Sequence, residues 1–237
     1  LDHMTGGRIG WNIVTGYMKA ALRNGMAAEM PHDERYDRAD EYMEVVYKLW
    51  EQSWCDDAIV LDIDTSTYAD PDKVRRIDHR GRYFSVQGPH HSEPSPQRTP
   101  LLAQAGGSSR GVAFAATHAE LVFIIATSIA DAARSTKALR EAATKAGRIG
   151  PSIKVLPEIS WVVAETEQKA KAKYEQYLET ADVDGVLALL GGHTDTDFAG
   201  FAPKATLKGQ SSKGITTVAK IFEGIEGAGE WSFAELC

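Results

Sequence analysis

The order of apolar runs and helical patterns along the chain is the feature that most restricts its fold. Residues 101–105 (LLAQA) form a short apolar run, which is followed by the small residues of 106–109 (GGSS) and by apolar residues at helical spacing across 109–118. This succession of strand, tight turn and helix recurs along the chain. Such an alternation predicts a parallel sheet with crossover helices, either open or closed into a barrel.

Four segments have the β-branched and aromatic residues typical of strands, and Gly, Pro or polar clusters bound them. They are residues 8–15, 101–105, 120–126 and 153–163. Helices are predicted at 33–53, 109–118, 128–146, 165–180 and 213–223. The first of these helices has the clearest apolar stripe, which consists of Tyr36, Ala39, Met43, Val46 and Trp50.

Two segments interrupt the alternation. Residues 75–88 (RRIDHRGRYFSVQG) contain two short alternating runs around Gly81, and they predict an inserted β-hairpin. The Pro-rich residues 93–100 that follow predict a stiff surface link. Residues 191–210 show no periodicity and predict a long loop of the kind that forms a lid or a substrate wall.

The composition favours small molecules as partners. A formal net charge of −7 and a pI near 5.5 give no general attraction to nucleic acid or to an anionic membrane. Cys55 and Cys237 are too few for a disulfide framework or a cysteine zinc site, and they predict a reducing, cytoplasmic setting. No apolar stretch approaches the roughly 20 residues that span a bilayer. The opening LDHMTGG is typical of a helix end entering a turn, and we expect further residues before it.

The turn at residues 106–109 has two interpretations that the residues alone leave open. Unpaired backbone N–H groups, the positive end of a helix dipole and two hydroxyls, with the guanidinium of Arg110 nearby, are suited to holding a phosphate. Alternatively, the small residues only allow a tight turn, and Ser108 or Ser109 caps the helix. The turn matches neither the Rossmann glycine fingerprint nor the nucleoside-triphosphate loop.

Three further polar residues are candidates for ligand contacts. His32 and Tyr36 lie four positions apart at the start of the first helix, so they share a face one turn apart and could reach one ligand. A histidine at a helix start and a tyrosine in the core stripe is the structural alternative. Asn12 lies in the first strand, where a buried amide needs hydrogen-bond partners from a ligand or from the neighbouring strand.

The sequence contains no pattern that identifies a catalytic or metal centre. No Ser-His-Asp order, HExxH motif or convincing carboxylate pair is found by spacing. His90, His91 and Glu93 could be imagined as metal ligands, but adjacent histidines beside a Pro-rich link are more often surface residues. We therefore assign no catalytic residue and no metal site.

Taken together, several segments resemble a known enzyme family. They are GGRIGWNIVTG, HDERYDRADEYMEVVYKLWE, YADPDKV and SPQRTPLLAQAGGSSRG. In these segments the chain resembles the nitrilotriacetate and dibenzothiophene-sulfone monooxygenase branch of the bacterial-luciferase-like flavin enzymes. The resemblance is dense over residues 1–125 and continues more weakly to about residue 225.

The resemblance implies a (β/α)8 TIM barrel that uses reduced FMN. The FMN would come from a separate NAD(P)H:flavin reductase, and the enzyme would insert one oxygen atom of O2 into an organic small molecule. Relatives act on aminopolycarboxylates, sulfones and alkanes, some of them in xenobiotic degradation, and the loops at 56–72 and 191–210 would decide among substrates. A homo-oligomer is expected for the full-length form.

The resemblance also implies a set of FMN contacts. The positions that match the family's contacts are His32, Tyr36 and Ser108, with Asn12 and Ser109 as additions. Ser108, the N–H groups around it and Arg110 would hold the FMN phosphate. The resemblance therefore favours the phosphate-binding interpretation of the turn. It does not assign the proton donor for oxygen transfer.

By the same resemblance the chain corresponds to part of a barrel, about strands 4–7. We expect a single partial barrel domain over 1–237, with insertions at about 56–100 and 191–210. A rival hypothesis is a truncated, inactive remnant that at most binds flavin phosphate or associates with another barrel subunit. A weaker one is an unrelated α/β enzyme that uses the turn for a phosphosugar.

Overall fold

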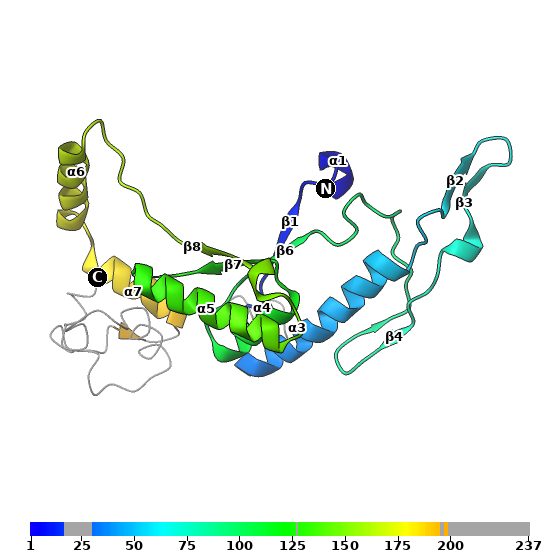
Figure 1. The fold of residues 1–237 in the computed structure, drawn as a ribbon, viewed down its shortest axis with the longest axis horizontal. Helices are drawn as coiled ribbons and strands as arrows, with labels where there is room; N and C mark the ends of the chain where they lie inside the picture. The colour runs from blue at the N-terminus through cyan, green and yellow to red at the C-terminus, as the bar shows by residue number, and fades with distance from the viewer. Residues whose placement is uncertain (17–29, 127, 195–196, 199–237) are drawn as a thin grey trace. The chain divides into compact units, whose positions relative to one another are not determined.

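A computed structural model of the chain describes residues 1–16, 30–126, 128–194 and 197–198 (Figure 1). The chain divides into two compact units. The first unit comprises Leu1–Thr15, Met30–Ile124 and Ser135–Leu156, and the second comprises Gly16–Glu29, Ile125–Arg134 and Pro157–Cys237. The expectation of one domain over 1–237 stays a prediction.

A four-stranded sheet organises the first unit. Its strands are β1 (Gly10–Ile13), β6 (Leu101–Ala105), β7 (Leu121–Ile124) and β8 (Lys154–Pro157), in the order β1-β6-β7-β8. The β1–β6 and β6–β7 pairs are parallel, with Asn12 beside Ala103 and Gln104 beside Val122. The alternation of strands and helices therefore predicted the parallel pairing.

Three strands are shorter than predicted: β1, β8 and β7, which was predicted at 120–126 and covers Leu121–Ile124. Local backbone chemistry explains the start of β1 and the end of β8. The predicted strand at 8–15 begins only at Gly10, because the N–H and C=O of Ile9 bond to the side-chain amide of Gln97 at 2.9 and 3.2 Å. The predicted strand at 153–163 ends at Pro157, a residue without an N–H group for a strand ladder.

The helices of the first unit lie where the periodicity predicts them. α3 (His32–Tyr47) continues into a π-helical turn, η1 (Lys48–Gln52), and α4 (Ser109–His118) matches its predicted bounds. Asp33 and Glu34 in the first turn of α3 suit the positive end of its dipole. The remaining short helices are α1 (Asp2–Thr5), η2 (Pro71–Lys73) and η3 (Gly150–Ser152).

α5 (Ile129–Lys145) begins in the second unit and ends in the first. The second unit also contains α6 (Glu167–Glu179), which was predicted, and α7 (Val183–Thr194), which was not. The sequence of α7, VDGVLALLGGHT, has apolar residues and glycines on all sides, so it lacks the stripe that reveals a helix. The predicted helix at 213–223 and most of the predicted loop at 191–210 lie outside the described residues. Residues 191–194 of that loop are helical, because α7 continues through them.

The core of the first unit lies on one face of the sheet. One cluster joins β1 and β6 to α3 and α4 and consists of Ile13, Tyr36, Met43, Val46, Leu102 and Phe114. A second joins β7 to α4 and α5 and consists of Ala115, Ala116, Ala119, Val122, Leu139, Ala143 and Ile153. Each large apolar side chain buried here contributes about 1.5–3 kcal/mol. On the opposite face, Leu101, Phe123 and Leu156 are 41–44% exposed.

The predicted hairpin at 75–88 is present. β4 (His79–Arg80) and β5 (Ser85–Val86) pair antiparallel, and the carboxylate of Glu41 on α3 accepts hydrogen bonds from the backbone N–H groups of Tyr83 and Phe84. This contact holds the hairpin against α3.

A second hairpin was missed. β2 (Ile59–Asp62) and β3 (Thr67–Ala69) pair antiparallel within the segment 56–72, which was predicted as a loop (Figure 1). Asp62 organises its turn by accepting hydrogen bonds from the N–H groups of Asp64 and Thr65, at 2.9 and 3.3 Å. The alternating run AIVLDID was the available signal for this strand.

Candidate functional site

The turn between β6 and α4 is built around Ser108. Ser108 has extended backbone at the N-cap of α4, and its Oγ accepts a hydrogen bond from the N–H of Gly111 at 3.0 Å. Because Oγ is the acceptor in that bond, the hydroxyl proton remains able to donate to a ligand. Gly107 and Ser109 are exposed, and a Cβ placed on Gly107 would meet nothing within 4 Å. The turn is therefore both a helix cap and an accessible donor site.

The hydroxyl of Tyr36 lies against this turn. A Cβ at Gly106 would lie 3.0 Å from Tyr36 Oη, and a Cβ at Gly111 would lie 2.8 Å from it. Both positions therefore require glycine for the backbone to approach the phenol this closely. Tyr36 is only 6% exposed, and its hydroxyl makes no hydrogen bond to any described residue. It is a donor at the turn without a partner among the described residues.

Gln104 is a polar residue of the site that the sequence analysis missed. It is 2% exposed at the end of β6, and its Oε1 has no hydrogen-bond partner within the described part of the chain. Its Nε2 lies 2.4 Å from the position that a Cβ at Gly106 would take. An unpaired buried amide oxygen is costly, so its place beside the turn needs an explanation. A lone glutamine inside the apolar run LLAQA was the signal in the sequence.

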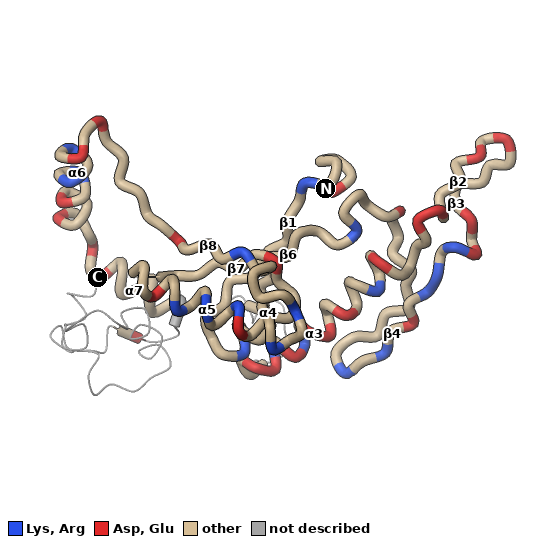
Figure 2. The backbone as a smooth tube through the Cα atoms, in the orientation of Figure 1, with Lys and Arg blue, Asp and Glu red and all other residues tan. Residues whose placement is uncertain are grey.

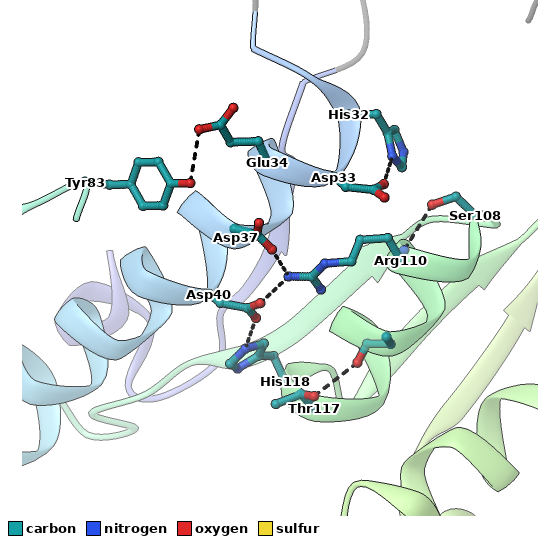
Figure 3. A network of polar contacts seen from close by, with 12 residues as sticks. His32, Asp33, Glu34, Asp37, Asp40, Tyr83, Ser108, Arg110, Thr117 and His118 are labelled. Atoms are coloured by element: carbon teal, nitrogen blue, oxygen red, sulfur yellow. Dashed lines mark hydrogen bonds and ion pairs between the residues drawn. The ribbon is translucent and has the colours of Figure 1, made fainter. Parts of the chain in front are cut away.

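A network of charged side chains joins α3 to α4 (Figure 3). The guanidinium of Arg110 on α4 bonds to Asp37, at 2.9 Å, and to Asp40 of α3. The other oxygen of Asp40 lies 2.9 Å from His118 Nε2, and His118 Nδ1 lies 3.1 Å from the hydroxyl of Tyr47. The network fixes the start of α4, and with it the turn, against the helix that carries Tyr36.

This network corrects one part of the sequence interpretation. We expected Arg110 to help hold the phosphate, but its guanidinium is turned toward the two carboxylates of α3. Burial raises the pKa of Asp40, but hydrogen bonds from His118 and Arg110 outweigh it, so the pKa lies below its usual range. Burial also raises the pKa of Tyr47 to about 12. The carboxylate of Asp40 is thus ionised at neutral pH and the phenol of Tyr47 is neutral.

His32 lies one turn before Tyr36, as predicted. The two rings meet edge to face with centroids 5.3 Å apart, and His32 Nδ1 lies 2.6 Å from a carboxylate oxygen of Asp33. The imidazole is partly exposed beside the turn-facing tyrosine. The structure therefore brings together His32, Tyr36 and Ser108, with Ser109 as the exposed neighbour.

Asn12 does not join this group. Trp11 and Ile13 of β1 pack into the core cluster with Tyr36, so Asn12 points to the other face of the sheet. It is exposed there, and the expectation that this amide is buried was wrong.

Comparisons with known proteins decide the family of the chain. The luciferase-like monooxygenase family matches residues 1–216. The chain is 44% identical over its whole length to the dimethyl-sulfide monooxygenase of Hyphomicrobium sulfonivorans, and it covers 49% of that protein. This chain belongs to the luciferase-like monooxygenase family.

Other relatives and solved structures agree with this assignment. The chain is 45% identical over 203 residues to the long-chain alkane monooxygenase of Geobacillus thermodenitrificans strain NG80-2, covering 85% of this chain and 46% of that one. The crystal structure of DmoA from Hyphomicrobium sulfonivorans matches with a TM-score of 0.84 at 42% identity, covering all of this chain and 51% of that one. The chain thus spans about half the length of the relatives it matches.

A third solved structure concerns the flavin directly. The riboflavin lyase RcaE, described with modified FMN and the substrate riboflavin, matches with a TM-score of 0.84 at 35% identity, covering 99% of this chain and 51% of that one. These neighbours confirm that the four-stranded sheet and its helices have the α/β architecture of the luciferase-like barrel.

The described residues contain neither a metal cluster nor a membrane-spanning helix. No group of three or more His, Cys, Asp or Glu side chains there could hold a metal ion. Among the same residues, no helix has the length and apolar character needed to cross a membrane.

Proposed function

We propose that this chain binds FMN through its phosphate and forms part of an FMNH2-dependent, two-component monooxygenase. The observation that supports the proposal most is the hydroxyl of Tyr36. This hydroxyl lies against the Ser108 turn, where Gly106 and Gly111 allow the backbone to approach it. It makes no hydrogen bond with any described residue.

The residues at the turn fit a phosphate. The hydroxyls of Tyr36 and Ser108 are donors, and the start of α4 adds backbone N–H groups and the positive end of its dipole. The open space at Gly107 leaves room for the phosphate oxygens. Arg110 pairs with Asp37 and Asp40 and so reduces the repulsion that these carboxylates would exert on an anion.

Each predicted contact has a separate task in this proposal. Tyr36 and Ser108 donate hydrogen bonds to the phosphate, and Ser109 is the next donor along the turn. His32 packs on the ring of Tyr36 and holds the edge of the site beside it. Asn12 lies on the other sheet face, where it would contact a more distant part of the cofactor. Reduced FMN, when bound, supplies the electrons that activate O2 for transfer of one oxygen atom to an organic molecule.

The names of the relatives support a class of substrates and a second component. They are called monooxygenases of dimethyl sulfide, of long-chain alkanes and of dibenzothiophene sulfone, and another is component A of nitrilotriacetate monooxygenase. We infer a small organic substrate for the complete protein and a separate NAD(P)H:flavin reductase that supplies FMNH2. The homo-oligomeric state and the cytoplasmic location stay predictions.

The test of this function is oxygen consumption coupled to a flavin reductase, with NADH, FMN and candidate sulfides, sulfones and alkanes. Ser108→Asp is the informative variant, because aspartate caps a helix as well as serine but places a carboxylate where the phosphate would lie. Thr166→Asp is the matched control, since Thr166 caps α6 in the same way.

We expect substrate-dependent oxygen use by the parent chain and by Thr166→Asp, with loss in Ser108→Asp. FMN binding without substrate-dependent oxygen use would refute the monooxygenase part of the proposal and support the flavin-binding remnant. Tighter binding of a sugar phosphate than of FMN would favour a phosphosugar enzyme.

A further inference from the structure

The hairpin β2–β3 exposes four large apolar side chains. The exposed side chains are Val60 (48%), Leu61 (65%), Ile63 (90%) and Tyr68 (52%). In Figure 1 the hairpin extends away from α3. Single exposed apolar residues are ordinary, but a group of them on one hairpin marks a contact surface.

The hairpin and the residues that flank it are acidic. Residues 56–72 contain six aspartates and no lysine or arginine, as Figure 2 shows. Several of these carboxylates are used locally, since Asp57 pairs with Lys73, Asp56 pairs with Arg98, and Asp62 organises the turn. Asp64 is exposed next to Ile63, and its carboxylate has no partner among the described residues. The tip of the hairpin thus combines one apolar side chain with one unpaired negative charge.

A groove beside the base of the hairpin has the complementary character. It has a volume of about 870 Å³, and its lining includes Trp54, Ile77, Arg75 and Arg76. Two acidic residues also line it, but Glu51 accepts a hydrogen bond from Thr99 and Asp56 pairs with Arg98. Trp54 also forms a bridge to Val74 at the base of the hairpin. Lysine and arginine elsewhere in the lining are paired, as Arg98 is with Asp56, but neither Arg75 nor Arg76 has an ion pair with any described residue. Figure 2 shows this basic stretch between β3 and β4.

We propose that the hairpin tip of one copy of this chain docks in the groove of a second copy. Ile63 would pack on Trp54 and Ile77, and Asp64 would pair with Arg75 and Arg76. A two-fold axis makes the contact reciprocal, so each copy gives one tip and receives one. A small anion in the groove would account for the two arginines but would leave the exposed apolar residues of the hairpin unexplained. A second copy accounts for both surfaces.

Charge reversal tests the pairing by sedimentation velocity on the full 237-residue chain. We expect Asp64→Arg and Arg76→Asp each to weaken self-association by about tenfold or more, because each places like charges across the contact. The double variant restores the opposite charges and should recover most of the affinity. Both positions are exposed, so circular dichroism should be unchanged. Association that ignores these charges, or a chain that stays monomeric, would overturn the proposal.

Cross-linking tests the register. Cys55 lines the groove and is a free thiol, so Ile63→Cys at the tip should form a disulfide with Cys55 of the second copy under mild oxidation. The experiment uses a Cys237→Ser background, and Ile63→Cys with Cys55→Ser is the matched control. A covalent dimer that requires both cysteines is the expected result. No dimer, or a dimer that persists without Cys55, counts against this register.

Discussion

At the scale of single residues, the site depends on groups that the fold leaves unpaired. The apolar stripe of α3 predicted that Tyr36 lies in the core, and its ring does. The structure adds that its hydroxyl reaches the β6–α4 turn. Helix spacing and turn chemistry act locally, so the sequence could predict that His32 and Tyr36 share a helix face and that Ser108 caps α4. Their assignment as FMN contacts came from the family resemblance and stays a prediction. The sequence could not predict the burial of Gln104 or the exposed position of Asn12, because both depend on which face of the sheet the helices cover.

Replacing Tyr36 by phenylalanine separates a binding role from a structural one. Because the hydroxyl of Tyr36 has no partner among the described residues, Tyr36→Phe should leave the thermal unfolding temperature unchanged. It should weaken FMN binding by about 1.5–3 kcal/mol, the usual value of a hydrogen bond to a charged group. The control is Tyr47→Phe, which loses the bond to His118 and should cost about 1 kcal/mol of stability while FMN affinity is kept. Equal effects of the two variants on FMN would contradict this role for Tyr36.

At the scale of elements, ion pairs between α3 and α4 set the geometry of the turn. The bounds of β6 and α4 and the stripe of α3 were predicted correctly because each pattern is contained in one segment. The pairing of Arg110 with Asp37 and Asp40 joins residues about 70 positions apart, which spacing along the chain does not reveal.

Arg110→Met tests whether this arginine positions the turn or binds the phosphate. The variant loses both ion pairs and should lower stability by about 1 kcal/mol, because the pairs are partly exposed. FMN affinity should fall only modestly, and the ratio of FMN to riboflavin affinity should be unchanged. A collapse of that ratio, measured by titration with both flavins, would show instead that the guanidinium contacts the phosphate.

The same network predicts a pH dependence of unfolding. The pKa of Asp40 is lower in the folded state than its ordinary value of about 3.9, so its ionised form stabilises the fold above that value. This stability is lost as the pH falls through the folded-state pKa. Thermal melts should show Asp40→Asn to be less stable than the parent at pH 6, and the difference should shrink below about pH 4. A difference that is constant or grows on acidification would contradict the pairing.

At the scale of the whole molecule, the two faces of the sheet differ in burial: helices cover one face, and the other is partly exposed. Alternation of strands and helices predicted the parallel sheet, and the family relationship confirms the barrel architecture. The tethering of residues 93–100 was not predictable, because the bonds of Gln97 to Ile9 and of Arg98 to Trp50 and Trp54 join distant segments. The segment predicted as a surface link therefore joins the residue before β1 to the chain in and just after η1.

Two adjacent residues of β7 test this difference in burial between the two faces of the sheet. Val122 is fully buried under α4 and α5, whereas Phe123 is 42% exposed on the other face. Val122→Thr should destabilise the first unit by about 1–3 kcal/mol, since it buries a hydroxyl in the core. Phe123→Thr should change stability by about 0.5 kcal/mol or less. Urea unfolding measures both, and a larger loss for Phe123→Thr would show that the second face is covered.

The central claim is that the Ser108 turn holds the phosphate of FMN, and a fluorescence titration of the 237-residue chain with FMN and with riboflavin tests it most directly. The account predicts saturable binding of FMN, weaker binding of riboflavin because it lacks the phosphate, and loss of FMN binding in Ser108→Asp with unchanged circular dichroism. Equal affinities for the two flavins, or FMN affinity unchanged in Ser108→Asp, would contradict it.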